Sequence, residues 1–115
     1  HFDLFHGKGN LEKAINLLDH ENKKDFKKFM ENRTSFNPHN MFVCKTEILK
    51  KYYNTIFPWL TKCEDIFEFE NLQGYGLKRI YGFLAERFLS FWLNKNYLVK
   101  ELPIIVKDLS DYKDL

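Results

Sequence analysis

The sequence predicts an α+β fold that is mainly helical, with a few short strands, in a single segment spanning residues 1–115. Three observations lead to this prediction. Apolar residues recur at intervals of three and four over most of the chain, as on the buried face of a helix. Only Asn40–Cys44 and Leu102–Val106 have the short, apolar, β-branched character of strands. Hydrophobic residues make up 44% of the chain and charged residues 30%, which are proportions typical of a globular domain.

Two helices and a strand are expected in the first part of the chain. Residues Asn10–Asp19 begin with Asn10, a residue type that favours the N-cap, and apolar residues follow at helical spacing. Residues Lys23–Asn32 place their aromatic side chains on one face and their lysines on the other. The polar stretch Thr34–Pro38 predicts a loop, and we expect a buried strand at Asn40–Cys44.

A long amphipathic helix is expected to begin at Thr46 and to extend past Leu60. Pro58 interrupts it, because proline has no N–H to donate to the carbonyl of Asn54 and its ring clashes with that group. The sequence therefore predicts a kink or a restart at this position. The helical pattern fades over the acidic stretch Glu64–Glu70.

The most informative helix is expected at Leu77–Leu93, after a loop marked by Gly74 and Gly76. From residue 80 onward its only charged residues are Glu86 and Arg87. A helix that is apolar almost all round is buried, so an ionised carboxylate on it must be paired, neutralised or directed into a polar cleft. Glu86 is therefore a candidate site residue.

The residues alone leave two interpretations of this charged pair open. Glu86 and Arg87 could belong to a structural ion-pair network with Arg79, or they could face a cleft as an acid or base beside a cation that holds a phosphate. The two neighbours point about 100° apart on a helix, so they do not simply pair with each other.

The last apolar stretch, Leu102–Val106, is rich in β-branched residues and predicts a second short strand. Pro103 confines this strand to a sheet edge or to its own first residues, because proline donates no hydrogen bond to a neighbouring strand.

Composition gives no support to several classes of protein. The 18 basic and 16 acidic residues give a net charge of +2, which is too weak a field to indicate a nucleic-acid partner. The two cysteines are too few for a disulfide scaffold or a four-ligand zinc site, and they indicate free thiols in a reducing, cytoplasmic setting. The four histidines have no metal-ligand spacing, so no metal is expected in this segment.

Because the chain begins with His1 and enters directly into apolar residues, we expect further sequence before it.

Five groups of residues together resemble a known family. In order, they are His6, Phe36 with His39–Val43, Ile56–Leu60, Gly82–Arg87 with Phe91–Leu93, and Glu101–Ile104. In this order and spacing the chain resembles the C-terminal half of a bacterial family of capsular-polysaccharide and lipopolysaccharide glycosyltransferases, long labelled a domain of unknown function. The most specific parts are Asn-Met-Phe at 40–42 and Gly-Phe-Leu-Ala-Glu-Arg at 82–87.

The resemblance implies a GT-A-like α/β glycosyltransferase fold, of which this chain is the C-terminal, acceptor-side part. An N-terminal half would bind the nucleotide-sugar donor and any Mn²⁺ or Mg²⁺. The implied partners are a nucleotide-sugar and a polysaccharide or lipid-linked acceptor, with no nucleic acid. The implied location is the cytoplasm, with a peripheral position at the inner membrane as one option.

The resemblance also implies roles for individual residues. Glu86 is the candidate base that removes the proton of an acceptor hydroxyl. The candidate substrate-binding residues are His6, His39, Asn40, Met41, Arg79 and Arg87. Of these, the two arginines would bind the diphosphate or orient Glu86, and His6 would contact the donor phosphates or the acceptor. Asn40 and Met41 would lie at a strand end near the sugar.

A function of a different class is the alternative. The chain could be a non-catalytic helical interaction module in which Glu86, Arg79 and Arg87 form a buried structural network and the aromatic residues are all core. A third interpretation is a weak nucleic-acid binder that uses the lysines between residues 23 and 28.

Overall fold

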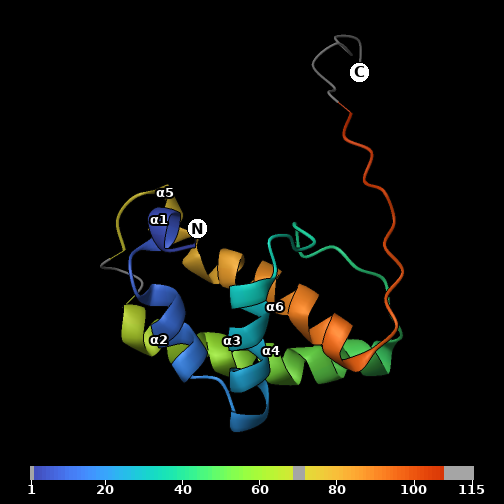
Figure 1. Cartoon of the computed structure of the whole chain (residues 1–115), viewed down its shortest axis with the longest axis horizontal. Coiled ribbons are helices and arrows are strands. Elements are labelled where there is room, and N and C mark those ends of the chain that lie inside the picture. Colours follow the sequence, from blue (N-terminus) through green and yellow to red (C-terminus); the bar gives the residue numbers. More distant parts are fainter. Residues whose placement is uncertain (1, 69–71, 108–115) are drawn as a thin grey trace.

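The computed structural model describes residues 2–68 and 72–107, and these residues are mainly helical (Figure 1). The helices follow one another as α1 (Phe2–His6), α2 (Asn10–Asn16), α3 (His20–Asn32), α4 (Thr46–Phe67), α5 (Tyr75–Lys78) and α6 (Ile80–Asn96). Helices α4 and α6 pack side by side, α3 packs against α6, and α1 lies against α5. The end of the acidic stretch predicted at Glu64–Glu70 lies outside the described residues.

The prediction of short strands is wrong for the described residues. Asn40–Cys44 holds a turn followed by extended chain, and Leu102–Val106 is extended, exposed chain. Neither segment makes a backbone hydrogen bond to another segment within the described part. A strand is stabilised by pairing with a neighbour, and β-branched composition alone does not supply one.

Helices α2 and α3 have N-caps that the sequence did not predict. Gly9, with φ of 79°, is the N-cap of α2, and Asn10 is its first helical residue. The Asn10 side chain instead donates from Nδ2 to the carbonyl oxygen of His6 at 2.8 Å. Helix α3 begins before the predicted Lys23 because Asp19 accepts a hydrogen bond from the backbone N–H of Asn22 at 2.9 Å.

Helix α4 continues through Pro58 for 22 residues, so it does not restart there. A proline inside a helix costs about 3 kcal/mol, because it removes one backbone hydrogen bond and crowds the preceding turn. Both Pro58 and Asn54 are exposed, so water can satisfy the carbonyl that lost its donor. Buried side chains on either side, including Ile56 and Trp59, hold the helix in place by tertiary packing.

The helix predicted at Leu77–Leu93 is two helices joined at Arg79. Arg79 has φ of –102° and ψ of 12°, which ends α5 and begins α6. The predicted apolar face of α6 is confirmed, since Ile80, Leu84 and Phe88 are fully buried.

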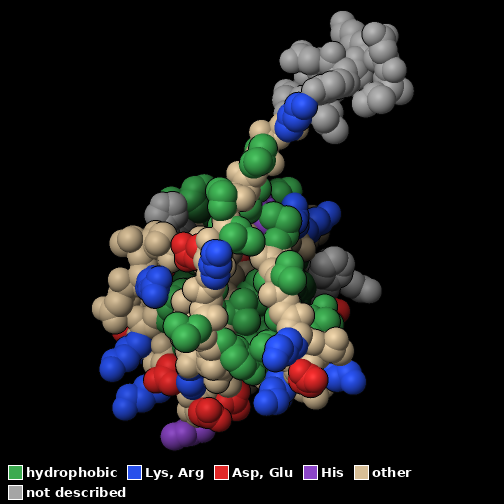
Figure 2. Space-filling view, turned by 90° about the vertical axis from the view of Figure 1, so that its right-hand side faces the viewer, with side chains coloured by type: hydrophobic (Ala, Val, Ile, Leu, Met, Phe, Trp, Pro, Cys, Tyr) green, Lys and Arg blue, Asp and Glu red, His purple; other side chains and the backbone are tan. Residues whose placement is uncertain are grey.

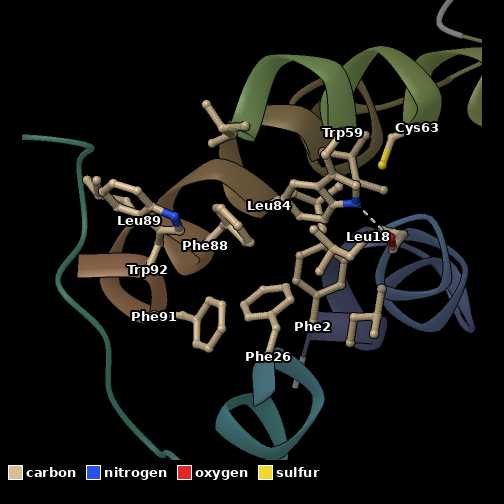
Figure 3. Packing of buried hydrophobic residues seen from close by; sticks show 14 of the residues in the cluster. Phe2, Leu18, Phe26, Trp59, Cys63, Leu84, Phe88, Leu89, Phe91 and Trp92 are labelled. Atoms are coloured by element: carbon tan, nitrogen blue, oxygen red, sulfur yellow. Dashed lines mark hydrogen bonds between the residues drawn. The ribbon is translucent and has the colours of Figure 1, made fainter. Parts of the chain in front are cut away.

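Aromatic side chains from three helices form the centre of the core (Figure 3). The ring of Phe26 on α3 lies 5.4 Å from that of Phe88 on α6, and Phe88 lies 4.9 Å from Trp59 on α4. The indole Nε1 of Trp59 donates to the carbonyl oxygen of Ala14 at 2.7 Å, which fastens α2 to the same core. The indole therefore buries its ring without leaving its N–H unpaired.

Hydrophobic side chains also gather on one face of the molecule, with lysine and arginine side chains around them (Figure 2). The exposed apolar residues of the described part include Met41, at 60% exposure, and Ile105, at 89%.

No helix in residues 2–68 and 72–107 is long and apolar enough to span a bilayer. Both cysteines are free, and burial raises the pKa of the Cys63 thiol to about 12, so this thiol stays protonated.

Candidate functional site

A groove of about 790 Å³ lies between α1, α5, α6 and the segment that follows α3. Three of the predicted site residues, His6, Glu86 and Arg87, line it together. Its walls carry six aromatic rings, those of Phe2, Phe5, Phe29, Phe36, Tyr75 and Phe83. Aromatic walls with a few polar groups are typical of small-molecule sites, and rings of this kind stack on the apolar faces of sugars.

His6 is held rigidly at the groove. Its ring centroid lies 4.4 Å from that of Phe2 and 4.2 Å from that of Phe83, and the residue is 5% exposed. The ring nitrogen Nδ1 lies 3.0 Å from the carbonyl oxygen of Gly76. A carbonyl only accepts hydrogen bonds, so Nδ1 carries the proton and donates to Gly76.

Burial lowers the pKa of His6, and the positive charge of Arg87 lowers it further. The hydrogen bond to Gly76 and the charge of Glu86 act in the opposite direction but do not outweigh burial. The imidazole is therefore neutral at pH 7, and Nε2 is its unprotonated nitrogen.

Glu86 projects from α6 as a half-buried carboxylate that lines the groove. It makes no hydrogen bond and no ion pair within residues 2–68 and 72–107. Arg79 is exposed and instead donates from Nη1 to the hydroxyl of Tyr75 at 2.8 Å. The three charged side chains therefore do not form the structural ion-pair network that was one interpretation of the sequence.

Arg87 lies between two aromatic rings. Its Cζ atom is 4.5 Å from the ring centroid of Phe36 and 4.8 Å from that of Phe2. Its Nη1 donates to the carbonyl oxygen of Phe83 at 3.0 Å. Burial lowers the pKa of Arg87, yet a guanidinium stays charged at every physiological pH. In the described part, this half-buried cation makes no ion pair and feels the charge of Glu86 only at longer range, so it favours a bound anion at the groove.

The structure does not bring every predicted residue to the groove. His39 and Asn40 form an exposed turn with φ of 77° and 47°, and Met41 is exposed beside them. None of the three lines the groove, and the strand end expected at this position is absent from the described chain. Arg79 does not line the groove itself, but its guanidinium lies over the rings of Tyr75 and Phe83, which do.

Residues 1–97 match a family whose description is "Domain of unknown function (DUF4422)". The chain belongs to the DUF4422 family. All residues that line the groove fall within the matched range, whereas the described chain at 98–107 falls outside it. Comparison with curated proteins and with solved structures gives no match.

One wall of the DUF4422 groove depends on Ser90, which the sequence analysis did not single out. Its Oγ accepts a hydrogen bond from the backbone N–H of Asn37 at 2.9 Å and donates to the carbonyl oxygen of the same residue at 3.2 Å. These two bonds hold the loop after α3 against α6 and so place Phe36 over Arg87. A buried hydroxyl on an otherwise apolar helix face is the signal that could have identified Ser90.

Arg33 is a second cation on this wall that sequence reasoning missed. It lines the groove near the end of α3, and its Cζ lies 5.6 Å from the ring centroid of Phe29. No group of three His, Cys, Asp or Glu side chains that could hold a metal occurs in the described part of this DUF4422 chain.

Replacing Gly76 with alanine is expected to destabilise the protein by about 1–3 kcal/mol, as overpacking typically does. A Cβ atom at this position would overlap the carbonyl oxygen of Phe5, which is backbone and cannot swing aside. The free energy of unfolding, measured by urea denaturation, tests this. Gly82→Ala is the matched control: a Cβ there meets nothing within 4 Å, so about 0.5–1 kcal/mol of added stability is expected. Equal stability of Gly76→Ala and wild type would contradict the packing of α5 on α1.

Proposed function

We propose that this DUF4422 chain is the acceptor-side part of a GT-A-like glycosyltransferase that moves a sugar from a nucleotide-sugar to a surface polysaccharide or lipid-linked acceptor. The observation that carries the proposal is the groove, where a carboxylate and a guanidinium that make no ion pair within residues 2–68 and 72–107 line one space with aromatic rings. A carboxylate serves as a base toward a sugar hydroxyl, a guanidinium binds phosphate, and rings stack on sugars. The resemblance of residues 82–87 to a glycosyltransferase motif supports the same function.

In the proposed reaction, the Glu86 carboxylate accepts the proton of an acceptor hydroxyl. The hydroxyl oxygen then forms a bond to the anomeric carbon of the donor sugar. The bond from that carbon to the diphosphate oxygen breaks, and the electron pair leaves with the nucleoside diphosphate. Arg87 stabilises the negative charge that develops on the leaving group, because its remaining N–H groups make no ion pair with a carboxylate in the described part of the chain.

The donor side belongs to a separate part of the enzyme in this proposal. The described residues offer no cluster that fits Mn²⁺ or Mg²⁺, so either metal would be held by the donor-binding half and no step here depends on it. Under the proposal the reaction takes place in the cytoplasm, where a peripheral contact with the inner membrane gives access to lipid-linked acceptors.

The test of the proposal is release of nucleotide from a panel of nucleotide-sugars. The protein assayed is a polypeptide that contains this chain together with the donor-binding half, with and without Mn²⁺ and with candidate acceptors. We expect release from at least one donor, at a rate that rises when an acceptor is added. If no donor is consumed under any of these conditions, the non-catalytic helical interaction module becomes the better account.

A further inference from the structure

His6 has one polar ring atom left for a ligand. Its Nδ1 is committed to the carbonyl oxygen of Gly76 at 3.0 Å, and Phe2 and Phe83 pack against the ring. Its Nε2 makes no hydrogen bond to any residue that the structure describes. Since His6 lines the groove, the ring is a fixed hydrogen-bonding group at the edge of the candidate site.

We propose that His6 recognises one hydroxyl group of the bound acceptor sugar. Its Nε2 accepts a hydrogen bond from that hydroxyl and so selects acceptors that carry it. This inference rests on the proposed function for the identity of the ligand, and it decides between the two roles that the resemblance left open. A neutral imidazole cannot attract the donor phosphates by charge. A phosphate oxygen and an unprotonated Nε2 are both acceptors, whereas a hydroxyl can donate.

The surroundings keep His6 in the required state. From α5 the Gly76 carbonyl fixes the tautomer, and from α6 the charges of Glu86 and Arg87 act on the ring in opposite directions. From α2, Asn10 contributes an uncharged amide that bonds the His6 backbone. Burial then lowers the pKa of the imidazole, so Nε2 remains an acceptor at neutral pH.

Such a hydrogen bond is expected to produce a large difference in kcat/KM between an acceptor and its deoxy analogue. A site built to hydrogen-bond a substrate hydroxyl strongly rejects the analogue that lacks it, because the bound analogue covers the polar group of the site and gives it no partner. Glu86 receives the proton of the attacking hydroxyl, so His6 contacts a second hydroxyl of the same sugar.

The test compares a full acceptor with the monodeoxy analogues that keep the attacking hydroxyl and lack one other hydroxyl each, in the polypeptide assayed for transfer. We expect the wild type to discriminate against one analogue by about 100-fold or more in kcat/KM. His6→Asn keeps a donor near the Nδ1 position and removes the acceptor at Nε2, so its discrimination is expected to fall to about threefold or less. His6→Gln, whose longer amide reaches the Nε2 position, is expected to restore part of it. A purely structural role would lower all rates together and leave the ratio unchanged.

Two results would overturn the inference while leaving the transferase intact: a wild type that uses each of these monodeoxy analogues as well as the full acceptor, or a His6→Asn variant that keeps the full ratio. A second readout does not depend on transfer. In ¹⁵N spectra of the chain, we expect the Nε2 resonance of His6 to report an unprotonated nitrogen at pH 7 and to shift when the acceptor sugar is added. If no transfer is found but this shift occurs, the proposed reaction fails and the hydroxyl contact stands. If Nε2 is protonated at pH 7, or the resonance does not respond, the hydroxyl contact fails.

Discussion

Glu86→Gln is expected to lower the rate of sugar transfer by at least about 100-fold while leaving the melting temperature nearly unchanged. The amide has the shape of the carboxylate but does not accept the proton of the acceptor hydroxyl. Stability should be preserved because, in the described residues, the carboxylate makes no ion pair or hydrogen bond that the amide would lose. The measurements are the initial rate of nucleotide release with acceptor and the thermal unfolding of the same preparation.

Glu31→Gln is the matched control for this variant. Glu31 is an exposed glutamate near the end of α3, it does not line the candidate groove, and it makes no ion pair in the described part of the chain. Its replacement should change neither rate nor stability. A Glu86→Gln protein that is folded and as active as the wild type would remove Glu86 from the chemistry. A loss of activity that follows a loss of folded protein would assign the residue a structural role.

The core of this fold could be predicted from the sequence because it depends on periodicity. Ile80, Leu84 and Phe88 recur at intervals of four on a helix with almost no charge, and all three are fully buried. The strand at Asn40–Cys44 could not be judged in the same way. Its composition suits a strand, but pairing depends on a neighbour elsewhere in the chain, and the described residues provide none.

The candidate site was predictable where one helix defines it and not where distant segments meet. Glu86 stands out because it is a lone carboxylate on an apolar helix. The hydrogen bond from His6 to Gly76 joins residues 70 positions apart, and only the folded chain shows that it fixes the imidazole. The position of His39 and Asn40 in an exposed turn away from the groove could not be predicted, because the positive φ angles of a turn leave no trace in hydrophobic periodicity.

Phe26→Ala is expected to cause the largest loss of stability, about 3–5 kcal/mol of unfolding free energy. Phe26 is fully buried, and its ring lies 5.9 Å from that of Trp59, 5.4 Å from that of Phe88 and 5.1 Å from that of Phe91. It is thus the side chain through which α3 contacts both α4 and α6 (Figure 3). Removing the ring leaves a cavity that three helices must collapse to fill, and aromatic neighbours have few ways to do so.

Phe57→Ala makes the same chemical change at a surface position of α4. Phe57 is 55% exposed, and its ring lies 5.1 Å from that of Tyr53, so a loss of about 1 kcal/mol is expected. Urea denaturation, monitored by circular dichroism, gives the unfolding free energies of the two variants.

Domains of this size have about 5–15 kcal/mol of stability, so Phe26→Ala could leave too little folded protein to measure. Phe26→Leu then supplies the comparison, because it keeps an apolar side chain of smaller volume and should lose less than the alanine variant. Equal losses for Phe26→Ala and Phe57→Ala would show that α3 is not held through this ring. The loop after α3 would then depend on the hydrogen bonds between Ser90 and Asn37 for its position at the groove.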